Sequence, residues 1–194
     1  MFARYIFSWS LPLFIAASAT AIEWEEAYYQ VNAGAAVAVP FHDADMPLGY
    51  GARLQADYVL PLLVEQHWQA VFSGGFQWTV FRPEKAENQV GATSYLGDVT
   101  AILRRDMVFD NGRKFWYGLG LGVQGAMEAG IYRWIDQSGE FAVQTLENQT
   151  LFATTVNLNT SLEITDSMQI NFDAVKSVYP KGYDYIATTF GLRF

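Results

Sequence analysis

The sequence predicts an all-β fold: an eight-stranded antiparallel transmembrane up-and-down β-barrel. Three observations lead to this fold class. Hydrophobic and polar residues alternate with a period of two over eight segments, which is typical of strands with two different faces. Charged residues make up only 16% of the 194 residues, against about 25% in a typical soluble domain. Beyond the N-terminal segment, no run approaches the ~20 apolar residues that a membrane-spanning helix needs.

Each expected strand is defined by hydrophobic residues that recur in steps of two. In chain order these hydrophobic faces run from Tyr29 to Val39, Tyr50 to Leu60, Trp68 to Val80, Tyr95 to Leu103, Phe115 to Val123, Phe152 to Leu162, Ile170 to Val178 and Ile186 to Phe194. They predict strands at 28–39, 49–60, 68–81, 94–105, 115–127, 151–164, 168–179 and 183–194. Two residues break the pattern, because Ile102 falls on a polar face and Lys176 on a hydrophobic face.

The expected connections alternate between the two ends of the barrel. One end carries the connections 40–48, 82–93, 128–150 and 180–182, and the other carries 61–67, 106–114 and 165–167. The last two contain Asp110-Asn111-Gly112 and Thr165-Asp166-Ser167, which are residue types that form tight turns. An even number of strands places both ends of the barrel domain at this second end, which we expect to face the periplasm.

Residues 1–21 are typical of a secretory signal peptide. Arg4 precedes an apolar stretch from Tyr5 to Ala17, and Ala19-Thr20-Ala21 has the small-x-small pattern of a cleavage site. An uncleaved membrane anchor is the alternative. The sequence is therefore divided into a signal peptide, 1–21, and a barrel domain, 22–194.

Charge and cysteine content exclude several functions. The net charge is −8 and the sequence has no basic run, so nucleic-acid binding is not expected, since phosphate neutralisation needs clustered Lys and Arg. The chain contains no cysteine, which excludes disulfides, thiolate catalysis and cysteine-ligated metals.

The composition of the polar faces indicates which side of the strands meets lipid. These faces are built of Asn, Gln, Ser, Thr and Gly with few charges, and no lysine lies on them. Strands whose polar face meets water usually carry charged residues such as Lys. We therefore interpret the polar faces as a filled barrel interior and the hydrophobic faces as lipid-facing. A soluble periplasmic ligand-binding barrel, with its hydrophobic residues inside, is the alternative.

Aromatic residues mark the ends of the hydrophobic faces, as the two aromatic girdles of a membrane barrel do. The candidate girdle residues are Tyr50, Tyr58, Trp68, Trp78 and Phe194. The ten steps from Trp68 to Trp78 correspond to a rise of roughly 23 Å at ~3.3 Å per residue and ~45° tilt, close to the ~25 Å apolar band of such barrels. Burial of these tryptophans in a soluble core is the alternative.

With its signal peptide, eight alternating strands and terminal aromatic residue, the chain resembles the small OmpA/OmpX-type outer-membrane barrels of Gram-negative bacteria over residues 22–194. The resemblance implies a monomer in contact with outer-membrane lipid, with both mature termini in the periplasm. It also implies that the barrel-assembly machinery recognises the last strand. The residues that match this assembly signal are Ile186, Phe190, Leu192 and Phe194, whereas Thr188 departs from the pattern.

Seven charged residues have the parity of the barrel interior. They are Arg53, Asp57, Asp98, Arg104, Glu163, Asp173 and Arg193. Buried charges must pair or cost on the order of several kcal/mol each, so we predict a salt-bridged plug. An eight-stranded barrel encloses just enough space for side chains, and a diffusive pore is therefore not expected.

The connection 128–150 is the most informative exposed segment. It predicts a hairpin, Ile131–Ile135 and Glu140–Leu146, around an Asp136-Gln137-Ser138-Gly139 turn. Tyr132, Trp134 and Phe141 are candidates for a surface that binds a partner by strand addition. A mere extension of the barrel wall is the alternative interpretation.

No catalytic, cofactor or metal site is expected. His42, beside Asp43 and Asp45, is the sole candidate base for a lipid A-modifying enzyme, the alternative function, since His67 belongs to the opposite end. The glycines of Gly118–Gly122 lie within a strand, where small residues make room for larger opposing side chains, and do not form a phosphate loop. The expected function is a structural or surface-interaction role in the outer membrane.

Overall fold

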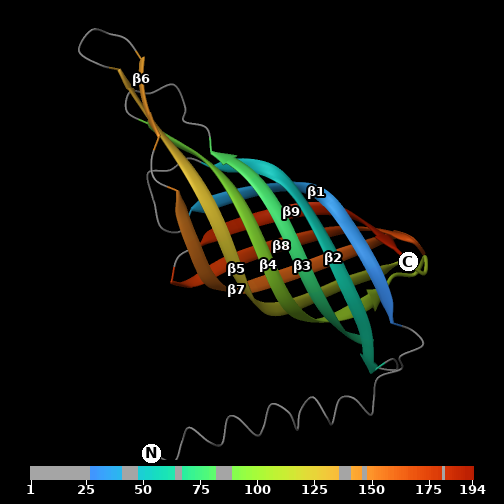
Figure 1. Cartoon of the computed structure of the whole chain (residues 1–194). Coiled ribbons are helices and arrows are strands. Elements are labelled where there is room, and N and C mark those ends of the chain that lie inside the picture. The colour runs from blue at the N-terminus through green and yellow to red at the C-terminus, as the bar shows by residue number, and fades with distance from the viewer. Residues whose placement is uncertain are drawn as a thin grey trace, which may run out of the picture.

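The computed structural model describes residues 27–40, 48–63, 67–81, 89–135, 141–145, 148–180 and 182–194 (Figure 1). The expected signal peptide, 1–21, and His42 lie outside these residues. The described residues form β1 (Tyr28–Pro40), β2 (Gly49–Leu63), β3 (Trp68–Phe81), β4 (Gln89–Val108), β5 (Lys114–Ile135), β6 (Phe141–Thr145), β7 (Gln149–Thr165), β8 (Met168–Pro180) and β9 (Tyr183–Arg193). Among them no helix is long and apolar enough to cross a membrane, a criterion that does not apply to strands.

Eight of these strands close into an antiparallel up-and-down barrel, as the sequence predicts. Each strand pairs with its neighbour in the chain, except that β5 pairs with β7 across β6. The barrel closes where β1 pairs with β9, from Gln30 opposite Arg193 to Pro40 opposite Tyr183. Tyr29 and Phe194 extend this pairing with two backbone hydrogen bonds of 2.9 and 3.3 Å. The last strand is therefore hydrogen-bonded along its whole length.

The two ends of the barrel differ in their connections. We call one end the turn end; it carries the connections 64–67, 109–113 and 166–167, together with Tyr28 and Phe194. We call the other the loop end; it carries the connections 41–48, 82–88, 136–148 and 181–182. In the turn 109–113, Phe109 and Gly112 close the backbone with a 2.9 Å hydrogen bond. Gly112 has a φ of 79°, a left-handed conformation that favours glycine, so the turn expected at Asp110-Asn111-Gly112 is present.

The sixth strand lies outside the barrel, in a projection from the loop end. β5 is 22 residues long, and its last part, Ile131–Ile135, pairs with β6. The same part of β5 pairs on its other side with Gln89–Gly91 of β4. Figure 1 shows this projection rising away from the barrel wall. The expected hairpin is thus joined by a third strand, because the extended β5 offers a pairing edge to residues of β4 that show no alternation of their own.

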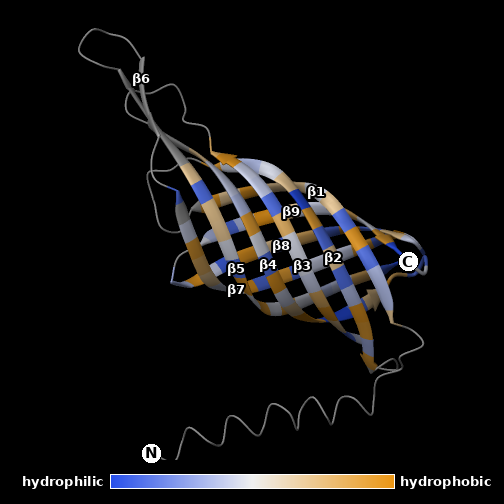
Figure 2. Ribbon diagram, in the orientation of Figure 1, coloured by the Kyte–Doolittle hydropathy of each residue, from blue (hydrophilic) through white to orange (hydrophobic). Residues whose placement is uncertain are grey.

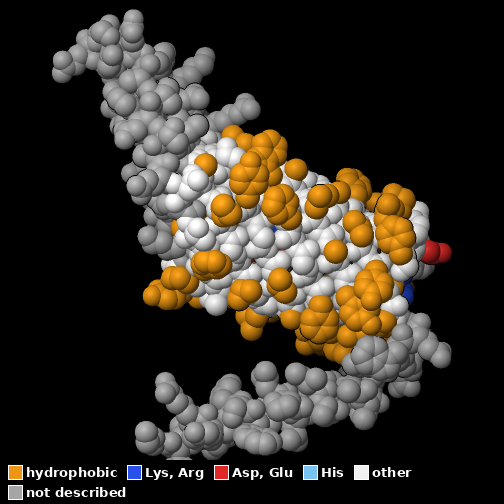
Figure 3. Space-filling view, in the orientation of Figure 1, with side chains coloured by type: hydrophobic (Ala, Val, Ile, Leu, Met, Phe, Trp, Pro, Cys, Tyr) orange, Lys and Arg blue, Asp and Glu red, His pale blue; other side chains and the backbone are white. Residues whose placement is uncertain are grey.

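The strands present hydrophobic side chains outward and mostly polar side chains inward. Figure 2 shows the alternation along the strands of the barrel, and Figure 3 shows hydrophobic side chains over the barrel wall. Exposed fractions reach 59% for Leu54, 64% for Val99 and 70% for Leu121. In contrast, Asn32 and Thr189 on the inner face are fully buried. The direction of each face is therefore the reverse of that in a soluble barrel.

Candidate functional site

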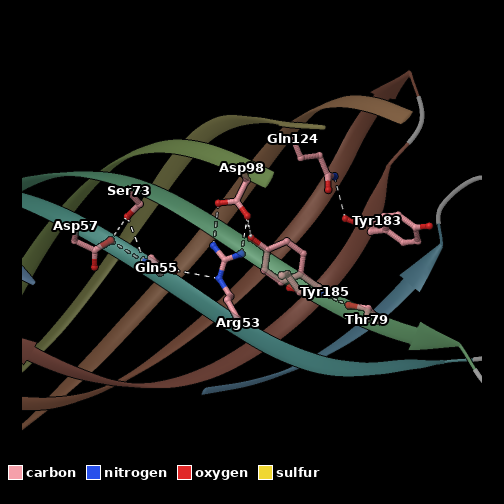
Figure 4. Close-up of polar contacts among 10 residues, drawn as sticks. Arg53, Gln55, Asp57, Ser73, Thr79, Asp98, Gln124, Tyr183 and Tyr185 are labelled. Carbon is pink, nitrogen blue, oxygen red and sulfur yellow. Dashed lines mark hydrogen bonds and ion pairs between the residues drawn. The ribbon is translucent and has the colours of Figure 1, made fainter. Parts of the chain in front are cut away.

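The middle of the barrel interior holds a buried ion pair between β2 and β4. The Arg53 guanidinium donates two hydrogen bonds to the Asp98 carboxylate, of 2.6 and 2.9 Å, and both side chains are 2% exposed (Figure 4). The Tyr185 hydroxyl donates a third hydrogen bond to Asp98, of 3.0 Å, and the Tyr185 ring lies 4.9 Å from the guanidinium carbon. Fork-to-fork geometry of this kind makes the pair strong and directional.

The absence of a side chain at Gly75 leaves room for this ion pair. A methyl group added at Gly75 would lie 2.4 Å from an Arg53 nitrogen and 2.8 Å from an Asp98 oxygen. The neighbouring Gly74 faces outward, and nothing lies within 4 Å of a methyl group added there. The inner wall of β3 is therefore shaped around the pair, a function of glycine that the sequence shows only once the opposing residues are known.

Two interior carboxylates are held by neutral side chains. Asp57 accepts hydrogen bonds from Asn32 at 2.7 Å, from Gln55 at 2.9 Å and from Ser73 at 2.6 Å. Asp173 accepts one from Asn159 at 2.8 Å. The sequence predicts a network of salt bridges here, whereas amide and hydroxyl donors surround these carboxylates. Such donors compensate a buried charge without a second charge that must also be desolvated.

At the turn end, two arginines converge on one tyrosine. Arg104 and Arg193 each donate a hydrogen bond to the Tyr28 hydroxyl, of 3.0 and 3.1 Å. Arg104 also donates to Gln69 at 3.1 Å and lies over the Trp116 ring at 5.2 Å. Arg193 lies over the Tyr28 ring at 4.0 Å. Glu163 pairs with neither arginine, because its carboxylate accepts from the Lys114 backbone N–H at 3.2 Å.

Only two of the seven predicted interior charges therefore form an ion pair with each other in the described structure. Among the described residues, Arg53 and Asp98 are that pair. The expected salt-bridged network is wrong in this respect. The physical reason is position: Glu163 lies at the rim, and the other carboxylates are surrounded by amides on adjacent strands.

The loop end of the interior contains a buried hydrophobic cluster among polar side chains, and the sequence did not predict this cluster. Its buried cluster comprises Ala36, Ala38, Phe81, Ala92, Leu96, Ala126, Leu151, Val175, Tyr183, Tyr185 and Ala187. The rings of Phe81 and Tyr183 stack with their centroids 5.4 Å apart. Because the interior of a small barrel is filled by side chains, apolar residues with inward parity can pack against one another there. In the sequence, this cluster is indicated by the inward parity of Leu96, Leu151 and Val175.

The glycines of β5 act as the sequence predicts. A methyl group added at Gly118 would lie 2.6 Å from Cβ of Arg104, and one added at Gly120 would lie 2.7 Å from the Ile102 side chain. The larger residues of β4 therefore lie across the inner face of β5. Ile102, an exception to the alternation, is buried inside with Val59 and Val71.

The candidate girdle residues lie near the two ends of the outer wall. Tyr50 and Trp78 are exposed toward the loop end. Phe194 is exposed at the turn end, where Trp68 is half-buried and Tyr58 contacts Tyr29 with ring centroids 4.9 Å apart. The candidate assembly residues Ile186, Phe190 and Leu192 also face outward on β9.

Two charged residues on the outer wall face each other. Lys176 of β8 and Asp184 of β9 form an ion pair, and the Asp184 carboxylate also accepts from the Ser177 backbone N–H at 2.8 Å. Lys176, which interrupts the hydrophobic face of β8, is therefore paired with Asp184, where the hydrophobic face of β9 ends. The pair lies toward the loop end of both strands.

The remaining candidate residues lie on the projection and at the turn end. The side chains of Tyr132, Trp134 and Phe141 lie outside the described part of the structure. His67 lies at the turn end, 3.0 Å from Asp106. Within the described ranges, no group of three or more His, Asp or Glu residues could hold a metal ion.

The comparisons with known proteins support the fold. No protein-family model and no curated protein sequence match the chain. Among solved structures, the attachment invasion locus protein Ail of Yersinia pestis, in complex with the heparin analogue sucrose octasulfate, matches with a TM-score of 0.50 and 12% identity, over 87% of this chain and 97% of that one. Neisserial surface protein A matches with a TM-score of 0.47 and 16% identity, over 86% and 95% of the two chains.

At these identities the likeness concerns the fold. The resemblance to small eight-stranded outer-membrane barrels, drawn from the sequence, is confirmed at that level.

Proposed function

We propose that the chain is an integral outer-membrane β-barrel protein with a structural or surface-interaction role and no catalytic activity. The hydrophobic outer wall of the barrel is the main support for this proposal. Each of the eight barrel strands exposes large hydrophobic side chains, for example Val31, Leu54, Phe76, Val99, Leu121, Phe152, Phe172 and Phe190. A surface of this extent is unfavourable in water and matches the hydrocarbon core of a bilayer.

The proposed orientation places the turn end in the periplasm and the loop end outside the cell. Tyr50 and Trp78 then form part of one aromatic girdle, and Tyr58, Trp68 and Phe194 part of the other. β9 carries the assembly signal for the barrel-assembly machinery. A closed barrel satisfies every strand edge in the membrane, so the monomer is a complete spanning unit.

Labelling of introduced cysteines tests this proposal, because the chain has no cysteine of its own. Asp110→Cys places a thiol in the exposed turn 109–113, and Asn148→Cys places one at the exposed start of β7 at the loop end. In intact cells we expect a membrane-impermeant maleimide to label Asn148→Cys and not Asp110→Cys. Both variants should fractionate with the outer membrane and migrate differently on a gel before and after boiling. Recovery in the soluble periplasmic fraction would contradict the proposal.

The interior is proposed to be plugged. The hydrophobic cluster at the loop end and the Arg53–Asp98 pair below it fill successive levels of the lumen with side chains. Single-channel recording of the purified protein tests the plug, and steady conductance would overturn it.

The surface-interaction role is proposed for the projection at the loop end. Within the described residues, β6 pairs with β5 alone, so its second edge carries unpaired backbone groups. An edge of this kind suits a partner that adds a strand. Deletion of 131–146 should abolish partner binding or adhesion while leaving the boiled and unboiled gel mobilities different. Unchanged adhesion would instead support a mere extension of the wall.

A further inference from the structure

We propose that the cavity at the turn end of the barrel binds a small organic ligand that carries a carboxylate or phosphate group. The cavity has a volume of about 330 Å³ and is lined by Tyr28, Trp68, Gln69, Lys114, Trp116 and Arg193, among others. Ligand pockets commonly span about 300–1,000 Å³, so this cavity suits a small ligand. The site is separate from the projection at the loop end and from the Arg53–Asp98 pair.

Positive charge is the first feature of the turn end that points to a bound anion. Among the described residues, no carboxylate oxygen lies within 4.0 Å of a guanidinium nitrogen of Arg104 or Arg193, the terminal carboxylate of Phe194 included. Arg104 is only 2% exposed, and a buried cation without a counter-charge is costly. Two acids lie nearby, but neither pairs with these arginines: Asp106, which also lines the cavity, faces His67 at 3.0 Å, and Glu163 accepts from the Lys114 backbone N–H. A bound anion would supply the missing negative charge.

Trp116 and Tyr28 also offer hydrogen-bond donors. The indole nitrogen Nε1 of Trp116 is buried and has no hydrogen-bond partner in the described structure, although this side chain lines the cavity. The Tyr28 hydroxyl accepts from both arginines, which leaves its own hydrogen to donate to a further acceptor. Carboxylate and phosphate oxygens are acceptors that match guanidinium, indole and phenol donors together.

Flat aromatic and guanidinium faces also lie at the cavity. The Trp116 ring has the Arg104 guanidinium 5.2 Å away and the Arg193 guanidinium 6.0 Å away, and Trp68 and Tyr28 are also in the cavity wall. Aromatic and guanidinium faces bind planar or apolar groups by stacking. The geometry therefore favours a charged group attached to a flat or apolar body over a bare ion.

Nuclear magnetic resonance of the folded full chain in detergent micelles tests this inference. The probes are benzoate, a planar carboxylate, and inorganic phosphate, each titrated while the tryptophan indole N–H signals are recorded. Trp116→Phe assigns the Trp116 signal. We expect a saturable shift of that signal with at least one probe, and the tighter-bound probe distinguishes the carboxylate from the phosphate as the recognised group.

Matched arginine variants then locate the bound anion. Arg193→Gln should weaken the binding by about tenfold or more, because a charged hydrogen bond is lost. The control is Arg113→Gln, an exposed arginine of the turn 109–113 that is not among the residues lining the cavity. This control variant should bind the probe with the same affinity as the parent protein. Lys114→Gln, at the exposed start of β5, is a second variant in case Arg193→Gln does not assemble, and it should also weaken binding.

Two results would overturn the inference. One is the absence of a saturable shift of the Trp116 signal with either probe in folded protein. The other is equal affinity for the parent protein, Lys114→Gln and Arg113→Gln. Neither result depends on the orientation of the barrel in the membrane, so failure here is distinguishable from failure of the proposed function.

Discussion

The middle and the turn end of the barrel interior accommodate buried arginines in different ways. Arg53, in the middle, has two hydrogen bonds to Asp98, and Gly75 leaves room for the pair. Arg104, at the turn end, has neutral partners only, Gln69 and Tyr28, beside the Trp116 ring. The difference follows the space around each group. In the middle, where side chains fill the lumen, a carboxylate pairs with the arginine; at the turn end, beside the cavity, neutral groups hold it.

The largest expected effect comes from breaking the pair in the middle. Asp98→Ala leaves the Arg53 guanidinium buried without its carboxylate, and removes the acceptor of the Tyr185 hydroxyl. We expect the free energy of unfolding to fall by about 3–5 kcal/mol, the usual cost of leaving one member of a buried pair. Urea unfolding of the barrel in lipid vesicles measures this value.

A double variant tests whether this loss of stability comes from the unpaired charge or from the lost side-chain volume. Arg53→Met combined with Asp98→Leu removes both charges and keeps most of the side-chain volume, so it should regain most of the lost stability. A loss below about 1 kcal/mol for Asp98→Ala would show that solvent reaches Arg53, and the contrast with the turn end would disappear.

A smaller effect is expected from two adjacent glycines of β3. Gly75→Ala places a methyl group against Arg53 and Asp98, and overpacking of this kind costs about 1–3 kcal/mol. Gly74→Ala is the matched control, because its methyl group points into open space on the outer wall. Unfolding titrations of the two variants should therefore diverge. Equal stability would mean that the ion pair shifts freely within the lumen.

The fold could be predicted from the sequence because its period-two signal is local. A strand such as Tyr28–Val39 shows two faces whatever it pairs with, and the low charge content shows which face meets lipid. The parity of Arg53 and Asp98 placed both inside, toward the same end. The strand ends were less accurate, since β4 begins at Gln89 through its pairing with the projecting part of β5.

The contacts inside the barrel could not be predicted in the same way. Parity places Arg104, Glu163 and Arg193 inside near one end, but it does not give the register between strands. Register decides that Arg104 and Arg193 meet at Tyr28, and that Glu163 meets the backbone of Lys114 instead. Trp116 was overlooked because one inward aromatic residue has no local pattern. The cavity at the turn end depends on all these pairings at once.

The smallest expected effect comes from removing a turn-end arginine, and it is the sharpest test of the contrast. Arg104→Met loses the hydrogen bonds to Gln69 and Tyr28 but also removes a buried cation that has no described counter-charge. These contributions oppose each other, so we expect the free energy of unfolding to change by less than about 1 kcal/mol. Arg53→Met is the comparison, and it should cost about 3–5 kcal/mol because it leaves Asp98 buried and unpaired by any cation. Equal destabilisation of the two variants in the same urea titration would contradict this contrast. Arg104 would then have a counter-charge equivalent to the one that Asp98 gives Arg53, and the adjacent cavity would not need a bound anion.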